Sequence, residues 1–450
     1  MRRARWTMAW WVAGLLACPS GLWAGVVNVP CSAPTVFPGA AVNVVVVPYS
    51  APPELEGSRG VGLELARLVQ AETLLSIARY GSVGTVQLSI DGPCEPDTVL
   101  ARLMGEAPGA RETVRPGHGL VLVWGRIFRD GEDIYLQSYI RFARRGDAGA
   151  VGVRIGSETF LARPAGVAFA CVPRKVPLSD LAKINERFQR TEVLHRDADP
   201  SSPRTPLPAQ ASFAYQVTEI RGDWMHVQGS AGGPRGWLRA GSARSADWPL
   251  RALMPELFFV DGVAGYLRAQ VAIATREPTA IDGNLAAAET ALADYQRLWK
   301  SGALLLEGPP GGAGYQPLAV GIPLQIRALL VLQRPGVSVA ALQEAQSWLA
   351  RAVALVPYSG DARNLEVIGR LVLAYTARQR GIDLRATLSD LQQAAAADPD
   401  NTLALGNVAR LCRLLLGPEA SQPPDWRPLS DAERTELRQC VEAISALAGP

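Results

Sequence analysis

The chain of 450 residues is poor in histidine and in catalytic motifs. Its three histidines, His118, His195 and His226, are not spaced from one another or from cysteines as zinc ligands are. No Gly-x-Ser-x-Gly phrase marks a nucleophile elbow, and the glycine-rich stretch 308–314 lacks the Gly-Lys-Ser/Thr of a phosphate-binding loop. We therefore expect a protein that is not an enzyme and has no cofactor or metal site.

An excess of positive charge is also lacking. The formal net charge is +3, and Arg2, Arg3 and Arg5 account for all of it. The remainder of the chain is neutral, so it offers no broad electrostatic attraction to a polyanion. We expect no nucleic-acid partner.

The first 24 residues have the order of a bacterial secretory signal peptide. The three arginines precede an uncharged, mostly apolar run of 12 residues at 6–17, which is shorter than the roughly 20 residues that span a bilayer. Small residues then lead to Ala24, the expected cleavage position. This pattern predicts export to the periplasm. Beyond it, the sequence shows no apolar run of membrane-spanning length.

A second interpretation of the same stretch is open. Leu15-Leu16-Ala17-Cys18 resembles a bacterial lipobox, in which the cysteine is lipidated and becomes the mature N-terminus. Lipidation at Cys18 would make the protein a membrane-anchored lipoprotein instead of a soluble one.

Export makes disulfides plausible among the remaining cysteines. Cys412 and Cys440 are on two neighbouring predicted helices and form the best candidate pair. Cys31 with Cys94 is the second candidate, which leaves Cys171 over. The alternative is that several are small buried residues.

The N-terminal region, 26–170, predicts an α/β (α+β) domain. A run of β-branched residues at 42–47, ended by Pro48, predicts a buried strand. Asp130-Gly131 between two apolar runs is the signal of a hairpin turn. The expected elements are strands at 42–47, 83–90, 119–126 and 134–142, and helices at 61–80 and 97–104.

This order resembles the small α/β domains of bacterial envelope proteins, namely the TolB N-terminal domain and the curli-secretion (CsgG-like) lipoproteins. The resemblance rests on the first strand ending in Pro48-Tyr49 and on Gly125-Arg126-Ile127 followed by Asp130-Gly131. It implies a fold and an envelope setting, and no catalytic residue.

The second region, 171–246, predicts strands at 213–220 and 224–228 joined by a turn at 221–223, after an exposed proline-rich loop at 199–208. The phrase Gly222-Asp223-Trp224, followed by Gly236-Trp237-Leu238, resembles a bacterial SH3-like (SH3b) β-barrel domain. The resemblance implies peptide or cell-wall contact, with Trp224, Trp237 and His226 as candidate binding residues. Alternatively, both tryptophans fill the core of a small domain.

The third region, 250–447, is rich in alanine and leucine and predicts helices, among them one at 284–299 and a last one opened by the capping box Ser430-x-x-Glu433. It resembles a divergent tetratricopeptide (TPR) array, because Leu349, Ala352 and Pro357 recur 42 residues later as Leu391, Ala394 and Pro399. An ordinary helical bundle is the alternative.

Together these patterns predict a multidomain, exported, non-catalytic binding or scaffold protein of the cell envelope. Its partners would be other envelope proteins, extended peptides or peptidoglycan. Two alternatives remain, a lipidated component of an outer-membrane assembly or secretion system, and an enzyme with an unrecognised site.

Overall fold

The computed structural model describes residues 36–56, 61–87, 96–106, 113–145, 150–163, 168–171, 173–177, 193–206, 214–222, 224–229, 233–239, 250–300, 316–334, 336–357, 359–377, 384–397, 402–417 and 429–447. The predicted signal peptide lies outside these ranges, with its cleavage position Ala24 and its alternative lipidation site Cys18. Cys31, Cys94 and the glycine-rich stretch 308–314 lie outside them as well.

The centre of the N-terminal region is β1 (Val42–Val46), which pairs in parallel with both β2 (Val83–Gln87) and β3 (Gly119–Asp130). β3 pairs antiparallel with β4 (Asp133–Arg144) through a tight turn in which Gly131 has φ +61°. Three helical segments precede β3 in the described part of the chain. They are α1 (Pro53–Glu56), α2 (Val61–Ile77), which continues as the 3₁₀ turn η1 (Ala78–Tyr80), and α3 (Pro96–Met104). The predicted order of strands and helices is confirmed.

β1 is buried on both faces, which explains its unbroken run of apolar residues. Val42, Val44 and Val46 face the helix α2 side, in a cluster that includes Leu65 and Val69. Val45 and Val47 face the opposite side, in a cluster with residues of α3. The alternation of a strand therefore feeds two separate apolar layers.

The sheet extends beyond this α/β unit on both sides. On one side β4 carries two short edge strands, β7 (Ala168–Ala170) and β8 (Arg174–Lys175). On the other side β11 (Ala214–Arg221) pairs antiparallel with β2. The sheet continues from β11 through β12 (Trp224–Gly229), β13 (Arg235–Arg239), β9 (Val193–His195) and β10 (Arg204–Pro206).

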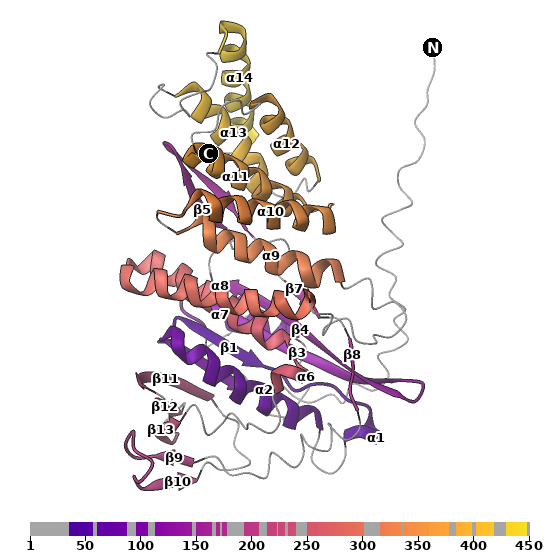
Figure 1. Ribbon diagram of the computed structural model, residues 1–450, viewed down its shortest axis with the longest axis vertical. Coiled ribbons are helices and arrows are strands. Elements are labelled where there is room, and N and C mark those ends of the chain that lie inside the picture. The colour runs from indigo at the N-terminus through magenta and orange to yellow at the C-terminus, as the bar shows by residue number, and fades with distance from the viewer. Residues whose placement is uncertain are drawn as a thin grey trace.

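The predicted domain boundary at residue 171 therefore does not interrupt the sheet. The strands at 213–220 and 224–228 form as predicted, but they join the α/β sheet through β2. Figure 1 shows β11, β12 and β13 beside the α/β unit of β1 and α2. Part of the predicted loop at 199–208 is the exposed edge strand β10, which ends in Pro206. Proline is tolerated there because an edge strand has one unpaired side.

The C-terminal helices form two rows that alternate along the chain. After α6 (Leu250–Leu253), they are α7 (Glu256–Thr275), α8 (Pro278–Lys300), α9 (Gln316–Leu332), α10 (Val339–Leu355), α11 (Gly360–Ala377), α12 (Leu384–Ala397), α13 (Thr402–Leu416) and α14 (Asp431–Leu447). Each packs on the next, and α7, α9, α11 and α13 also contact one another in sequence. Figure 1 shows the stack rising from the sheet to α14.

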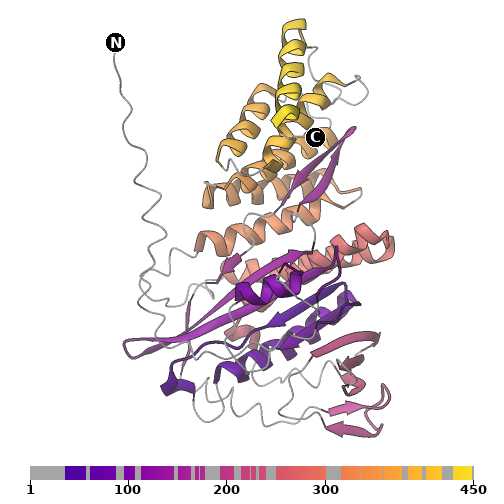
Figure 2. The same cartoon turned by 180° about the vertical axis from the view of Figure 1, so that it is seen from behind.

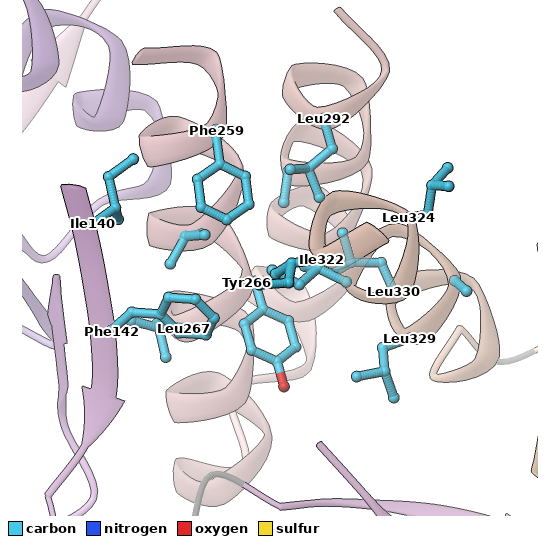
Figure 3. Packing of buried hydrophobic residues seen from close by; sticks show 14 of the residues in the cluster. Ile140, Phe142, Phe259, Tyr266, Leu267, Leu292, Ile322, Leu324, Leu329 and Leu330 are labelled. Atoms are coloured by element: carbon cyan, nitrogen blue, oxygen red, sulfur yellow. The ribbon is translucent and has the colours of Figure 1, made fainter. Parts of the chain in front are cut away.

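The helix α7 is the junction between this stack and the sheet. It packs on β1, β3, β4 and α2 on one side and on α8 and α9 on the other. Figure 3 shows Phe259, Tyr266 and Leu267 of α7 between Phe142 of β4 and the side chains of α9. One hydrophobic cluster runs without a break from β1 to α14, so the core crosses the predicted boundary at residue 250.

The burial of α7 also explains its hydropathy. Among the described residues, α7 is the helix long and apolar enough to cross a membrane by length and composition, with 83% of its apolar window buried inside the protein. It also carries buried Asp261 and Arg268. A helix covered on most sides must be apolar on most sides.

Two motifs read from the sequence have a direct structural basis. Ser430 and Glu433 form the predicted capping box, with the Ser430 N–H donating to Glu433 Oε2 at 2.8 Å and the Glu433 N–H donating to Ser430 Oγ at 3.3 Å. Tyr49 lies across Gly125, where an added Cβ would come within 2.1 Å of the tyrosine ring. The two phrases of the envelope-domain resemblance are therefore in contact.

Candidate binding site

The predicted binding residues Trp224, Trp237 and His226 lie together on one face of β12 and β13. The rings of His226 and Trp237 meet at 5.1 Å, and His195 meets Trp224 at 4.9 Å. Trp224 is 9% and Trp237 6% exposed. The structure thus brings the predicted residues together, and their burial favours the core interpretation of both tryptophans.

The surroundings of this aromatic face are cationic and compact. Arg221 lies over the Trp237 ring at 4.8 Å, and Arg239 lies over Trp224 at 5.9 Å. The opposite face, including Met225 and Val227, belongs to a cluster with Leu74 of α2. The five strands therefore have an apolar layer on α2 and an aromatic layer on the other face.

The predicted cysteine pair is close in space. Cys412 of α13 and Cys440 of α14 are free thiols with their Sγ atoms 3.1 Å apart. Burial raises the pKa of Cys412, and the neighbouring Cys440 raises it further. The two sulfur atoms are placed for an oxidant to link them.

Cys171 is the residue on which an enzyme interpretation would depend. It is buried at the end of β7, where its backbone N–H donates to Ser138 O at 2.9 Å. Burial raises the pKa of its thiol well above the ordinary value, and the negative charge of Glu256 raises it further. A reactive cysteine needs the opposite shift, towards thiolate. In the described part of the chain, no group of three or more His, Cys, Asp and Glu residues is placed to hold a metal ion.

A further set of polar contacts joins the helical stack to a hairpin. The hairpin consists of β5 (Val151–Ile155) and β6 (Glu158–Ala162), turns at Gly156-Ser157, and forms a two-stranded sheet of its own. It leaves the main sheet between β4 and β7 and lies along α11 and α13 (Figure 2). The alternating burial of Val151, Val153 and Ile155 shows that one hairpin face joins the core.

Two asparagines hold the free edge of β6 by its backbone. The N–H of Leu161 donates to Asn407 Oδ1 at 2.9 Å, and Asn407 Nδ2 donates to the Leu161 carbonyl at 2.6 Å. Asn364 Nδ2 donates to the same carbonyl at 3.0 Å. A side-chain amide on α13 thus makes the pair of bonds that a neighbouring strand would make. We call Asn364 and Asn407 the asparagine clamp.

The clamp is buried and internally satisfied. Both asparagine side chains are 0% exposed, and Asn407 Nδ2 also donates to Asn364 Oδ1 at 2.8 Å. Arg410 donates to Asn407 Oδ1 at 3.2 Å, which completes the four bonds of the Asn407 amide. Partial burial and the charge of Arg413 lower the pKa of Arg410. A satisfied buried network fixes one geometry.

Opposite charges bracket the clamp at the two ends of β6. Glu158, before the strand's centre, receives both Nε and Nη2 of Arg413 on α13 at 3.3 and 3.4 Å. Arg163, just after the strand, donates to Asp361 on α11 at 2.7 Å. Between them, Phe160 and Ala162 are 0% exposed. The surface of α11 and α13 therefore distinguishes the direction of the strand. It contacts an acidic residue and a basic residue at the two ends, with a buried aromatic residue and a buried small residue between them.

Part of this site has a recognisable signal in the sequence. Gly156-Ser157 between two alternating runs is the signal of a hairpin turn. The clamp itself has weaker signals: Asn364 and Asn407 are 43 residues apart, close to the 42-residue spacing of the TPR-like positions. Polar residues within a helix are ordinarily expected to face solvent, so these two gave no sign of burial.

Known proteins add nothing to these contacts. No family model, curated protein or solved structure matches the chain. The resemblances to TolB-like, SH3-like and TPR-like domains therefore stay predictions.

Proposed function

We propose that this protein is an exported, non-catalytic scaffold of the bacterial cell envelope, in which the helical stack binds extended segments of other proteins. The asparagine clamp is the observation that carries the proposal. It holds an extended strand through backbone groups that every residue except proline possesses. A surface that forms hydrogen bonds with the backbone of an extended segment suits a binding protein better than an enzyme.

In-cell photo-crosslinking tests the binding function. A photoreactive residue at position 410, beside the clamp, is compared with one at Gln392, an exposed position on α12. We expect a defined set of envelope proteins to be linked from position 410 and not from 392. Identical patterns from both positions would count against binding through the α11–α13 surface.

Export and anchoring are tested by the mature N-terminus. Mass spectrometry should find Gly25 as the first residue of a soluble periplasmic protein, after cleavage at Ala24. Peptide mapping without reduction should find Cys412 linked to Cys440, because the compartment is oxidising. A full-length chain that keeps its first residues in the cytoplasm would contradict the envelope setting.

A second candidate, a lipid-anchored component of an outer-membrane assembly or secretion system, is favoured by the contact of Tyr49 with Gly125. This contact joins the two phrases that resemble the TolB-like and curli-secretion domains. Lipidated Cys18 at the mature N-terminus would select this candidate.

The finer assignment of β9–β13 as an SH3-like domain implies contact with peptidoglycan. Sedimentation with purified peptidoglycan tests it, with a Trp237→Ala variant beside the native chain. Because Trp237 is buried, its replacement disturbs packing. The comparison is therefore made only if the circular dichroism spectrum of the variant matches that of the native chain. Equal sedimentation of the two would remove Trp237 as a contact residue.

A further inference from the structure

The β5–β6 hairpin is attached to the rest of the folded chain as a docked peptide would be. Its two strands pair with each other and with no strand of the main sheet among the described residues. Its principal packing partners are α11 and α13. A two-stranded hairpin is marginal by itself, so its order depends on this surface.

The contacts of β6 with α11 and α13 are of two kinds. Those to its backbone tolerate any sequence, and those to its side chains select particular residues. The asparagine clamp bonds only the backbone of Leu161, whose side chain is partly exposed. Selection comes from the buried side chains of Phe160 and Ala162 and from the ion pairs at Glu158 and Arg163. The selected pattern is acidic-x-aromatic-x-small-basic.

We propose that the α11–α13 surface is an exchangeable strand-binding site, and that its partner is an extended segment of another protein with the pattern acidic-x-aromatic-x-small-basic. The chain's own β6, Glu158-Thr159-Phe160-Leu161-Ala162-Arg163, occupies the site in the absence of that partner. This inference rests on the proposed scaffold function and names its partner class.

The charges of the site favour such a partner and set its direction. Arg413 favours an acidic residue at the first position, and Asp361, whose side chain is 9% exposed, favours a basic residue at the last. A strand entering in the reverse direction would place like charges together at both ends, which is unfavourable. The partner therefore runs along α13 and α11 in the direction of β6.

The hairpin also competes with the partner for the same site. A segment tethered to its own site competes at an effective concentration of the order of millimolar. A partner peptide has to displace the hairpin before it can bind. Its apparent affinity for the native chain is therefore lower than its affinity for a chain whose hairpin is held more weakly.

A peptide added in trans tests the site directly. The probe is a fluorescein-labelled synthetic peptide with the sequence of residues 157–164, and its anisotropy is followed with the full-length Phe160→Ala chain. The variant weakens the hairpin's own hold, because Phe160 is fully buried. We expect saturable binding to the variant and at least about tenfold weaker binding to the native chain.

Matched variants assign the binding to the clamp. Asn407→Ala in the Phe160→Ala background should weaken the peptide at least about tenfold, because two backbone bonds are lost. Gln392→Ala in the same background should leave it unchanged. A peptide with Arg163→Asp should bind poorly, and Asp361→Arg in the protein should restore it.

Folding and self-exchange are controlled separately. Circular dichroism tests whether the Phe160→Ala chain is folded, and Arg163→Glu, which breaks one end contact, serves as a milder second variant. An absence of peptide binding to both folded variants would overturn the strand-binding site, while the scaffold function would still be judged by the crosslinks from position 410.

A mixture of two variants identifies the occupant. The Phe160→Ala chain offers an open site, and the Asn407→Ala chain offers a native hairpin. If light scattering shows a one-to-one heterodimer at micromolar concentration, the occupant is a second copy, and the proposal of a different partner protein is overturned. Persistence of monomers, with peptide binding retained, supports the proposal.

Discussion

Two junctions hold this molecule together, and they use different chemistry. At the first, α6 and α7 join α2 through charged side chains: Arg251 binds Asp261 and Glu72, each at 2.8 Å, and Ser76 donates to Asp261 at 2.6 Å. At the second, the stack holds the β5–β6 hairpin through neutral amides on a backbone. The first junction depends on charged side chains of both partners, whereas at the second the clamp bonds only the backbone of β6. The side chains of Glu158, Phe160, Ala162 and Arg163 add selectivity there.

This difference indicates which of the two junctions stays closed in the folded protein. Removing one member of a buried ion pair leaves a charge without a partner, so the α2–α7 junction is costly to open. An exposed backbone amide regains hydrogen bonds from water when a strand leaves. The hairpin junction is therefore the one at which a partner can replace part of the chain.

Arg251→Met should give the largest loss of stability. Asp261 is buried at 3% side-chain exposure, and it would lose its cationic partner, at a cost of about 3–5 kcal/mol. Chemical denaturation followed by circular dichroism measures this change. Arg297→Met is the control, since Arg297 is 74% exposed in its pair with Asp294, and it should change stability by less than about 1 kcal/mol.

Asn407→Ala should have a smaller and local effect. The Leu161 N–H would lose its partner, at about 1–3 kcal/mol, and the hairpin should open while the rest of the fold stays intact. Hydrogen exchange measures this as faster exchange at 151–162 without change in α7. Acceleration spread over the whole chain would mean that the hairpin junction is as permanent as the first.

Asp261 should give the first junction a pH dependence that the neutral clamp lacks. Burial raises the pKa of Asp261 above its ordinary value of 3.8, although Arg251 opposes the shift. Stability from this group is then greatest below pH 3.8 and is lost as the pH rises through the raised value.

Asp261→Asn removes this titration. Denaturation at a series of pH values should therefore show the variant gaining stability relative to the native chain as the pH rises from 3.8. Asn407→Ala, compared in the same way, should show a constant difference. A constant difference for Asp261→Asn as well would mean that Arg251 fully offsets the burial.

Arg413→Ala should have the smallest effect. Arg413 is 44% and Glu158 20% exposed, so solvent screens their attraction and the loss should be below about 1 kcal/mol. Exchange of the turn amides at 156–157 should accelerate slightly, and the acceleration should disappear at high salt. A loss equal to that of Asn407→Ala would make the end charges, and not the backbone, the main hold on the hairpin.

Most elements of the fold were predictable because their signals are local. Five β-branched residues in six positions indicated β1, and Asp130-Gly131 indicated the turn between β3 and β4. Tertiary pairing was less accessible. No local pattern indicates that β11 pairs with β2, because their register joins residues far apart in the sequence, and a strand edge has no sequence signature for its partner.

The candidate site divides in the same way. The closeness of Cys412 and Cys440 followed from the expectation of two adjacent helices, and the aromatic residues of β12 and β13 met as their strand phrases suggested. The clamp did not follow, because its partners Leu161 and Asn407 are 246 residues apart. An asparagine in a helix carries no local mark of burial.

The sequence by itself determined the periods, turns and caps, since each depends on the geometry of a few consecutive residues. The tertiary structure alone decided that one sheet crosses two predicted domains and that one core runs from β1 to α14. It alone decided that buried amides hold β6. These outcomes depend on which surfaces meet after folding, and burial then gives two ordinary asparagines a partner in the backbone.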